Sequence, residues 1–344
     1  MSISDKINQY KENVELSLYP SFKGKSLNIE IASGCNERCI YCTYYARGTH
    51  KMAKMIDEKL FYRVTKEAYE LGITDVGLYM TGEPLTNPNV YKYVDYLKNQ
   101  IGFQYVYIST NGILLNPSNL EKLVNAGIDS IKFSVSGYDK KSFMQHHGVD
   151  AFEKVYQNIK YAFEYRKKNN LDYKLYMFSV ITKYNETYKK KIEELYTPFI
   201  DEIVMSNVLS NNSVKGVKEL LSVTGNNKSI TSGVTATVPC NMLFNKISIS
   251  ENGYLLACCY DSSTKSCIVA DLHTCSLKDG VYGEAMVDLR KRHLENCLEN
   301  TICNYCVRGI EEKVYPLTKE IDMEDCQMKN IDMTKEIKER FEIE

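Results

Sequence analysis

The chain has 344 residues, enough for one large domain or two of ordinary size, and 44% of them are hydrophobic, as in a globular protein with a core. Its formal net charge of −1 at pH 7 does not favour a nucleic-acid partner. No apolar run has the length of a signal peptide or a membrane span, so we expect a cytoplasmic protein without a membrane partner.

Short apolar segments alternate with longer amphipathic ones in the first two thirds of the chain. The apolar segments predict strands at residues 26–32, 75–80, 105–110, 130–136, 173–181 and 201–208. The amphipathic segments predict helices at residues 57–72, 89–100, 117–127, 150–169 and 186–196. Six units of this kind favour an α/β fold with a parallel sheet, either a partial barrel or an open sheet.

The last third of the chain has a different character. Residues 245–261 predict a β-hairpin, 286–296 a helix, and 332–344 a charged helical tail that we expect to be solvated. We therefore divide the chain into an N-terminal extension, a barrel, a linker rich in Ser, Asn and Gly, a small C-terminal domain and a tail, at residues 1–24, 25–210, 211–234, 235–330 and 331–344.

The chain contains 12 cysteines, and three of them, Cys35, Cys39 and Cys42, directly follow the first predicted strand. A disulfide framework is not expected in a large cytoplasmic protein, which leaves metal binding, redox chemistry or chance. In α/β folds the carboxyl ends of the strands carry the active site. Thiolate metal sites usually have four ligands, so either a distant residue completes this site or one position stays open.

Unusual segments also follow the next three predicted strands. They are TGEP (residues 81–84), TNG (110–112) and SGYD (136–139). Because the carboxyl ends of parallel strands meet at one edge, we expect these segments and the cysteine loop to share that edge.

The spacing CxxxCxxC, with an aromatic residue before the last cysteine, resembles the signature of the radical S-adenosylmethionine (SAM) enzymes. TGEP resembles the GGEP-like element of that family, and the six predicted units agree with its partial (β/α)6 barrel. The resemblance covers roughly residues 25–210 and implies that Cys35, Cys39 and Cys42 hold a [4Fe–4S] cluster whose fourth iron binds SAM. The alternative is a zinc site completed by His50 or a later cysteine.

The resemblance also implies a chemistry, in which the reduced cluster splits SAM into methionine and a 5′-deoxyadenosyl radical that takes a hydrogen atom from the substrate. Tyr41 should lie near the adenine, and the methionyl amine should lie near Thr81, Gly82 and Glu83, with Glu83 able to pair with it. Four strand-end residues could contact the ribose and carboxylate of SAM or serve only as turn residues, namely Ser109, Asn111, Ser134 and Ser136.

Three more residues are candidates for catalysis. Arg47 could neutralise a carboxylate or be a surface charge. His146 and His147 could face the cavity and take a substrate proton, or they could lie in a surface turn between helices.

Four later cysteines follow the pattern C-x12-G-x4-C and then C-x2-C, namely Cys240, Cys258, Cys303 and Cys306. This pattern resembles the auxiliary-cluster module of the SPASM/Twitch subfamily. The full SPASM pattern is not completed, because Cys326 is the next cysteine after the pair, so the resemblance implies the shorter Twitch arrangement with one auxiliary [4Fe–4S] cluster. Zinc is the alternative metal, and Cys259 or Cys297 could replace one ligand. We expect most of the other cysteines to be small buried residues.

The resemblance is close to the Twitch-type aminocyclitol dehydrogenases and to the sulfatase and peptide maturases. It implies an oxidoreductase that dehydrogenates or rearranges a hydroxylated small molecule such as a sugar or aminocyclitol. The auxiliary cluster would transfer electrons, and a flavodoxin or ferredoxin would be the reducing partner. The alternatives are a maturase that modifies a peptide or protein side chain, and a non-catalytic iron–sulfur or zinc protein.

Overall fold

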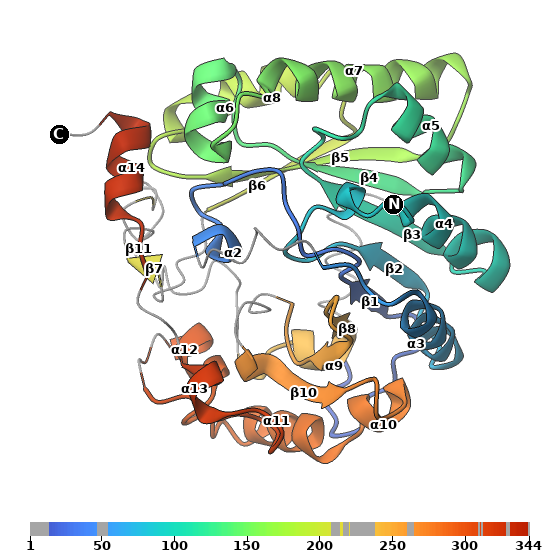
Figure 1. Ribbon diagram of the computed structural model, residues 1–344, viewed down its shortest axis with the longest axis vertical. Coiled ribbons are helices and arrows are strands. Elements are labelled where there is room, and N and C mark those ends of the chain that lie inside the picture. Colours follow the sequence, from blue (N-terminus) through green and yellow to red (C-terminus); the bar gives the residue numbers. More distant parts are fainter. Residues whose placement is uncertain are drawn as a thin grey trace.

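The computed structural model has an α/β fold built around one large twisted sheet (Figure 1). It describes residues 14–46, 54–207, 214–215, 220, 238–259, 265–308, 310, 312–327 and 331–342. Helices α5 to α8 lie along one side of the sheet, and the C-terminal elements from α9 to α13 gather at the opposite end of the molecule (Figure 1). The arrangement confirms the predicted α/β class.

The sheet has nine strands in the order β10-β9-β8-β1-β2-β3-β4-β5-β6. Strands β1 to β6 pair in parallel and in chain order. They are β1 (Ser26–Ile29), β2 (Asp75–Leu78), β3 (Tyr105–Thr110), β4 (Ser130–Ser134), β5 (Lys174–Ile181) and β6 (Glu202–Asn207). These strands confirm the six predicted ones, and several end early because the chain leaves the sheet to form loops at the carboxyl edge.

Helices connect the parallel strands, as the amphipathic segments predicted. They are α2 (Thr43–Ala46), α3 (Glu58–Glu70), α4 (Val90–Asp95), α5 (Pro117–Asn125), α6 (Lys140–His147), α7 (Phe152–Lys168) and α8 (Lys189–Tyr196). A π-helical segment, η3 (Tyr96–Ile101), continues α4, and η2 (Pro84–Thr86) and η4 (Glu186–Tyr188) are short 3-10 helices. Helix α3 begins where Asp57 accepts a hydrogen bond from the backbone N–H of Leu60. Helix α6 was not predicted, because its few apolar residues give no clear helical period.

The two faces of the parallel strands differ in chemistry. Outward-facing side chains such as Leu27, Val76 and Ile131 are fully buried under the helices. The opposite, inner face carries polar side chains such as Asn28, Tyr107 and Lys132, of which Tyr107 and Lys132 are only half-buried. Because side chains alternate along a strand, the helices cover only the apolar set and leave a polar inner face.

The predicted C-terminal hairpin is confirmed, but it continues the barrel sheet. Strands β8 (Lys246–Ile249) and β9 (Tyr254–Leu256) pair antiparallel, and β10 (Ile268–Asp271) follows β9. Strand β8 also pairs in parallel with β1 along its whole length. The C-terminal part therefore shares a hydrogen-bonded sheet with the first strand of the barrel.

The remaining C-terminal elements are α9 (Met242–Asn245), η6 (Lys265–Cys267), α10 (Leu277–Val281), α11 (Glu284–Leu294), α12 (Ile302–Arg308) and α13 (Met323–Cys326). Helix α11 confirms the helix predicted at residues 286–296. Most of the predicted linker lies outside the described residues, although Val214–Lys215 form β7 and pair with β11 (Ile331–Asp332). Among the described segments, no helix combines the length and apolarity needed to cross a bilayer.

The C-terminal tail forms the predicted charged helix, but only part of its surface is solvated, because one apolar stripe is docked on the protein. Helix α14 (Thr334–Phe341) buries Ile337 completely, and the preceding Met333 is also buried. Both pack against Ile40 in the cysteine loop and against Leu220. Charged residues dominate this segment, but an apolar residue recurs every fourth position, at 333, 337 and 341, and this narrow stripe docks the helix.

Candidate active site

The three-cysteine loop leaves β1 and ends in α2, at the carboxyl edge of the sheet. The backbone N–H of Glu37 points at the Cys35 sulfur (3.5 Å), and that of Tyr45 points at the Cys42 sulfur (3.5 Å). Burial raises the pKa of all three thiols, that of Cys35 to about 12 and that of Cys39 well above its usual value. The thiols are therefore protonated at neutral pH until a metal replaces their protons.

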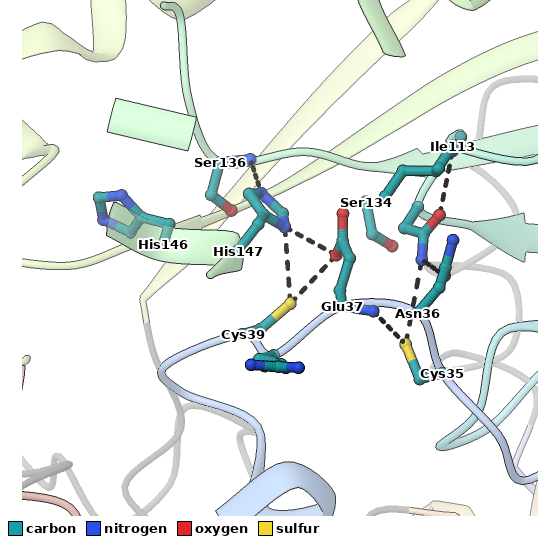
Figure 2. A network of polar contacts seen from close by, with 12 residues as sticks. Cys35, Asn36, Glu37, Cys39, Ile113, Ser134, Ser136, His146 and His147 are labelled. Carbon is teal, nitrogen blue, oxygen red and sulfur yellow. Dashed lines mark hydrogen bonds and ion pairs between the residues drawn. The ribbon is translucent and has the colours of Figure 1, made fainter. Parts of the chain in front are cut away.

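Glu37, which the sequence analysis missed, lies beside these thiols together with His147 (Figure 2). Its Oε2 atom is 3.2 Å from the Cys39 sulfur and 2.9 Å from Nδ1 of His147, and that Nδ1 is 3.5 Å from the same sulfur. These three groups are close enough to hold a metal ion. An acidic residue between two cysteines gives no signal in the sequence, because the histidine that binds it comes from α6.

Helix α6 also holds the loop through its backbone. The carbonyls of His146 and His147 accept hydrogen bonds from the N–H groups of Ile40 and Arg38, both 2.9 Å long. The alternative that the two histidines lie in a surface turn was wrong, since both are buried at the end of α6. Local spacing could not reveal this, because their partners lie on distant loops.

The two histidines have different surroundings (Figure 2). His147 faces Cys39, whereas His146 points away, with Nδ1 2.9 Å from the Ser142 carbonyl and Nε2 3.0 Å from the Thr182 hydroxyl. Burial lowers the pKa of His146 to about 4. His146 is therefore neutral and structural, and His147 is the histidine of the site.

The TGEP loop is held by a buried carboxyl group at the end of β1. One oxygen of Glu30 accepts hydrogen bonds from the Thr81 backbone N–H (2.9 Å), the Thr81 hydroxyl and the Gly82 N–H (3.0 Å). A side chain at position 82 would be 2.1 Å from the Ala32 carbonyl, so only glycine fits. The N–H of Glu83 donates to the Gly34 carbonyl (2.8 Å), which joins this loop to the cysteine loop.

Glu83 turns its carboxylate toward the end of β3. It accepts hydrogen bonds from the Thr110 hydroxyl (2.7 Å), the Asn111 N–H (2.8 Å) and the Leu85 N–H (3.1 Å). Burial raises the pKa of Glu83 to about 7 despite these donors. Its pairing with the methionyl amine of SAM stays a prediction.

The other predicted SAM contacts lie along the same edge. The Asn111 amide donates to Asn36 (2.6 Å) and lies 3.9 Å from the Cys35 sulfur. Two hydroxyl pairs complete the group, Ser109 with Ser134 (3.3 Å) and Tyr41 with Ser136 (3.0 Å). The edge thus brings the predicted strand-end residues close to the cysteine loop, and their individual roles stay predictions. Arg47 lies outside the described residues.

The C-terminal cysteines form a second group. Cys258 and Cys303 pack in one small cluster with the buried Cys267 and Cys326. The backbone N–H of Cys240 donates to Nδ1 of the buried His293 (3.3 Å). The burial of Cys267 and Cys326 agrees with their predicted role as small apolar residues.

Two of the remaining cysteines were possible replacement ligands. Cys297 is exposed. A hydrogen bond with Cys258, supported by the positive charge of Lys246, lowers the pKa of Cys259 to about 6 although the thiol is buried. The choice of ligands among these cysteines stays a prediction.

Residues 29–195 match the model of the radical SAM superfamily. This chain carries a radical SAM domain. A probable GTP 3′,8-cyclase of Saccharolobus solfataricus is 32% identical over 140 residues, which cover 41% of this chain and 44% of that protein. The GTP 3′,8-cyclase of Chlorobaculum tepidum is 30% identical over 129 residues, 38% of each chain. The match thus spans less than half the length of these curated relatives.

Three solved structures share the fold of the radical SAM domain and much of the rest of the chain. Streptococcus suis SuiB bound to the precursor peptide SuiA superposes with a TM-score of 0.60 at 16% identity, over 83% of this chain and 68% of SuiB. AnSMEcpe with bound AdoMet and a Cp18Cys peptide superposes with a TM-score of 0.56 at 16% identity, over 92% of this chain and 96% of that protein. BtrN in complex with AdoMet and 2-DOIA superposes with a TM-score of 0.50 at 17% identity, over 86% of this chain and 96% of BtrN. At these identities the likeness concerns the fold alone.

Proposed function

We propose that this protein is a radical SAM enzyme that dehydrogenates or rearranges a hydroxylated small molecule, with an auxiliary iron–sulfur cluster in electron transfer. The observation that carries the proposal is the cysteine loop at the carboxyl edge of the barrel, which presents three thiols and no fourth. Its N–H groups aimed at sulfur suit the thiolate ligands of an iron–sulfur cluster, which accept such hydrogen bonds. Cys35, Cys39 and Cys42 would therefore hold the cluster.

A [4Fe–4S] cluster bound there supplies one electron that splits SAM into methionine and a 5′-deoxyadenosyl radical. The protein positions the reacting groups around it. The Glu30 carboxyl group fixes the Thr81 and Gly82 N–H groups, and Asn111 lies between β3 and the cysteine loop. These contacts support SAM binding at this edge, with Tyr41, Ser109, Ser134 and Ser136 as further contacts.

The polar inner face of the barrel supports a hydroxylated substrate. Asn28, Tyr107, Ser109 and Ser134 offer hydrogen-bonding groups on strands that lead to the site. In a dehydrogenation, the carbon that bears the hydroxyl group gives a hydrogen atom to the adenosyl radical. The resulting substrate radical then loses the hydroxyl proton and one electron, which leaves a carbonyl group. The electron would pass to a cluster held by Cys240, Cys258, Cys303 and Cys306.

The proposal is tested by anaerobic reconstitution with iron and sulfide, followed by addition of dithionite and SAM. About eight irons per chain are expected, falling to about four in a Cys35/Cys39/Cys42→Ala variant. Only the parent should form 5′-deoxyadenosine. Cys275→Ala is the matched control, because Cys275 is a free cysteine that is not among the candidate ligands of either cluster.

Absence of 5′-deoxyadenosine from the iron-loaded parent would overturn the radical mechanism. About four irons in the parent and none in the variant, with zinc retained in both, would make the C-terminal cysteines structural and remove the electron acceptor. If the enzyme makes 5′-deoxyadenosine, screens of sugars, aminocyclitols and peptides follow. Turnover of peptides alone would overturn the small-molecule assignment in favour of a maturase.

A further inference from the structure

Two lysines converge on one tyrosine at the inner face of the barrel. The Lys132 ammonium on β4 lies 4.7 Å from the centre of the Tyr79 ring and 5.7 Å from that of Phe178. Lys246 opens β8 and pairs with Ser26 on β1, two residues before Asn28, so it faces the same side of the sheet as Asn28. Its charge also acts on the Tyr79 phenol. The sheet thus brings two positive charges, from distant parts of the chain, to the surroundings of the Tyr79 ring.

No carboxylate pairs with either ammonium group in the part of the chain that the structure describes, although the Cys259 thiol also lies within reach of the Lys246 charge. The lysine ion pairs found there all involve other lysines. Aromatic faces hold the Lys132 ammonium without using a carboxylate, so its N–H donors stay free for a ligand. Burial alone would raise the pKa of the Tyr79 phenol, but Lys246 and Lys132 outweigh it and hold that pKa below its usual value.

Neutral donors surround the same place. The Asn28 amide lies 3.4 Å from the Tyr79 hydroxyl, and the Tyr107 hydroxyl lies 3.4 Å from the Asn28 carbonyl oxygen. These side chains need Gly77 between them, because a Cβ there would be 2.6 Å from the Tyr107 ring. Tyr79, Tyr107, Lys132 and Lys246 are all half-buried, so solvent reaches this face.

We propose that Lys132 and Lys246, with the Tyr79 and Tyr107 hydroxyls that the buried Asn28 amide holds in place, bind a phosphate group of the substrate inside the barrel. Two ammonium groups match the charge of a phosphate monoester, and lysine suits phosphate as a point charge. The site lies on the strands that end at the cysteine loop, with Ser134 two residues beyond Lys132 on the same face. The inference rests on the proposed function for its place in the reaction, and it makes the substrate a phosphorylated hydroxy compound.

The test measures binding of inorganic phosphate to the reconstituted enzyme with SAM, by ³¹P line broadening or calorimetry. Lys132→Met and Lys246→Met should each weaken binding about tenfold, and the double variant more. Lys132→Arg, which keeps the charge, should retain most of the affinity. The control is Lys66→Met, because Lys66 is exposed on α3, outside the barrel.

Iron content and thermal unfolding of each variant show whether it is folded. Phosphate binding that is absent, or equal in the parent and the folded double variant, would overturn the inference. If malonate binds more tightly than phosphate and its binding depends on the same two lysines, the inference of a phosphate site would be wrong and the ligand would be a carboxylate. The parent's formation of 5′-deoxyadenosine reports separately on the proposed function, so the two can fail independently.

Discussion

The backbone N–H of Ser136 donates a hydrogen bond to Nε2 of His147 (2.9 Å). Nε2 therefore carries no proton, and the ring proton lies on Nδ1, from which it is donated to Glu37. The end of β4 thus orients an imidazole on α6, which in turn holds the Glu37 carboxylate beside Cys39, a predicted cluster ligand. Such a chain of hydrogen bonds fixes the position of a carboxylate next to a metal ligand.

Replacing Glu37 by Gln should raise the reduction potential of the SAM-binding cluster. The carboxylate is 3.2 Å from the Cys39 sulfur, and loss of a negative charge favours the reduced cluster. We expect a shift on the order of tens of millivolts, because cluster potentials respond to charge near the thiolates. An anaerobic redox titration followed by EPR measures it. Glu70→Gln, on the exposed end of α3, is the control, and an unchanged potential in Glu37→Gln would contradict the prediction.

Removing the imidazole should loosen the cysteine loop. His147→Ala leaves the Ser136 N–H without its acceptor and Oε2 of Glu37 with the Cys39 thiol alone, at a cost of about 1–3 kcal/mol in the free energy of unfolding. Urea unfolding of the apoprotein measures this, and the iron content after reconstitution should fall as well. His273→Ala removes a half-exposed histidine and should change neither quantity. Equal stability of the two variants would show that the His147 contacts do not hold the loop.

The buried Glu30 should make stability depend on pH. Burial, and then the nearby Glu251 carboxyl group, raise its pKa to about 8, from 4.5 in the unfolded chain. Between these values the folded protein keeps a proton that the unfolded chain has released, so the free energy of unfolding falls as the pH rises, by at most about 1.4 kcal/mol per pH unit.

Glu30→Gln cannot ionise and keeps an oxygen that can accept from Thr81 and Gly82, so its profile should be flatter. Some slope should remain, because burial also raises the pKa of Glu83 to about 7. Urea unfolding at several pH values between about 5 and 8 gives both profiles. Parallel profiles of the parent and the variant would contradict the assignment.

A methyl group at position 82 should disrupt the TGEP loop. The Cβ of Gly82→Ala would meet the Ala32 carbonyl oxygen at 2.1 Å, so the loop must shift, which strains the hydrogen bond from the Gly82 N–H to Glu30. We expect a loss of roughly 2 kcal/mol or more in stability and weaker SAM binding by equilibrium dialysis. Gly102→Asn is the control, because space is open there and Asn tolerates its positive φ of 93°. Normal SAM binding by Gly82→Ala would show that the loop adapts.

The docked C-terminal helix should stiffen the cysteine loop. Arg340 on α14 donates to the Arg38 carbonyl (2.7 Å), and a Cβ at Gly148 would be 2.7 Å from the same guanidinium. Ile337→Ala should reduce stability by about 2–4 kcal/mol and increase hydrogen exchange in residues 38–46. Lys335→Ala, whose side chain is 89% exposed, is the control. Unchanged exchange in Ile337→Ala would mean that the loop does not depend on the helix.

Sequence patterns predicted the elements whose periodicity is strong. The six parallel strands, the helices α3, α5 and α7 and the hairpin of β8 and β9 all carry regular apolar spacing, and the cysteine spacing pointed to the radical SAM domain. Partners that come from distant segments were not predictable. Glu37 is part of the site because it contacts His147, which comes from α6. The apolar stripe of α14 is buried because it packs against Ile40 in the cysteine loop. The pairing of β8 with β1 was also missed, because strand order in a sheet leaves no local pattern.

That pairing has a consequence for how the protein is made. Strand β1, which leads into the cysteine loop, finds one neighbour in β2, but its other neighbour is synthesised only when the ribosome reaches residues 246–249. Contacts so distant in sequence form late, and until then one edge of β1 has no partner. The backbone N–H of Glu30 donates to the Ile249 carbonyl, so the group that holds the TGEP loop also waits for this strand. We therefore expect the apoprotein to become competent for cluster insertion only after β8 has left the ribosome, which places iron loading late in synthesis at the earliest.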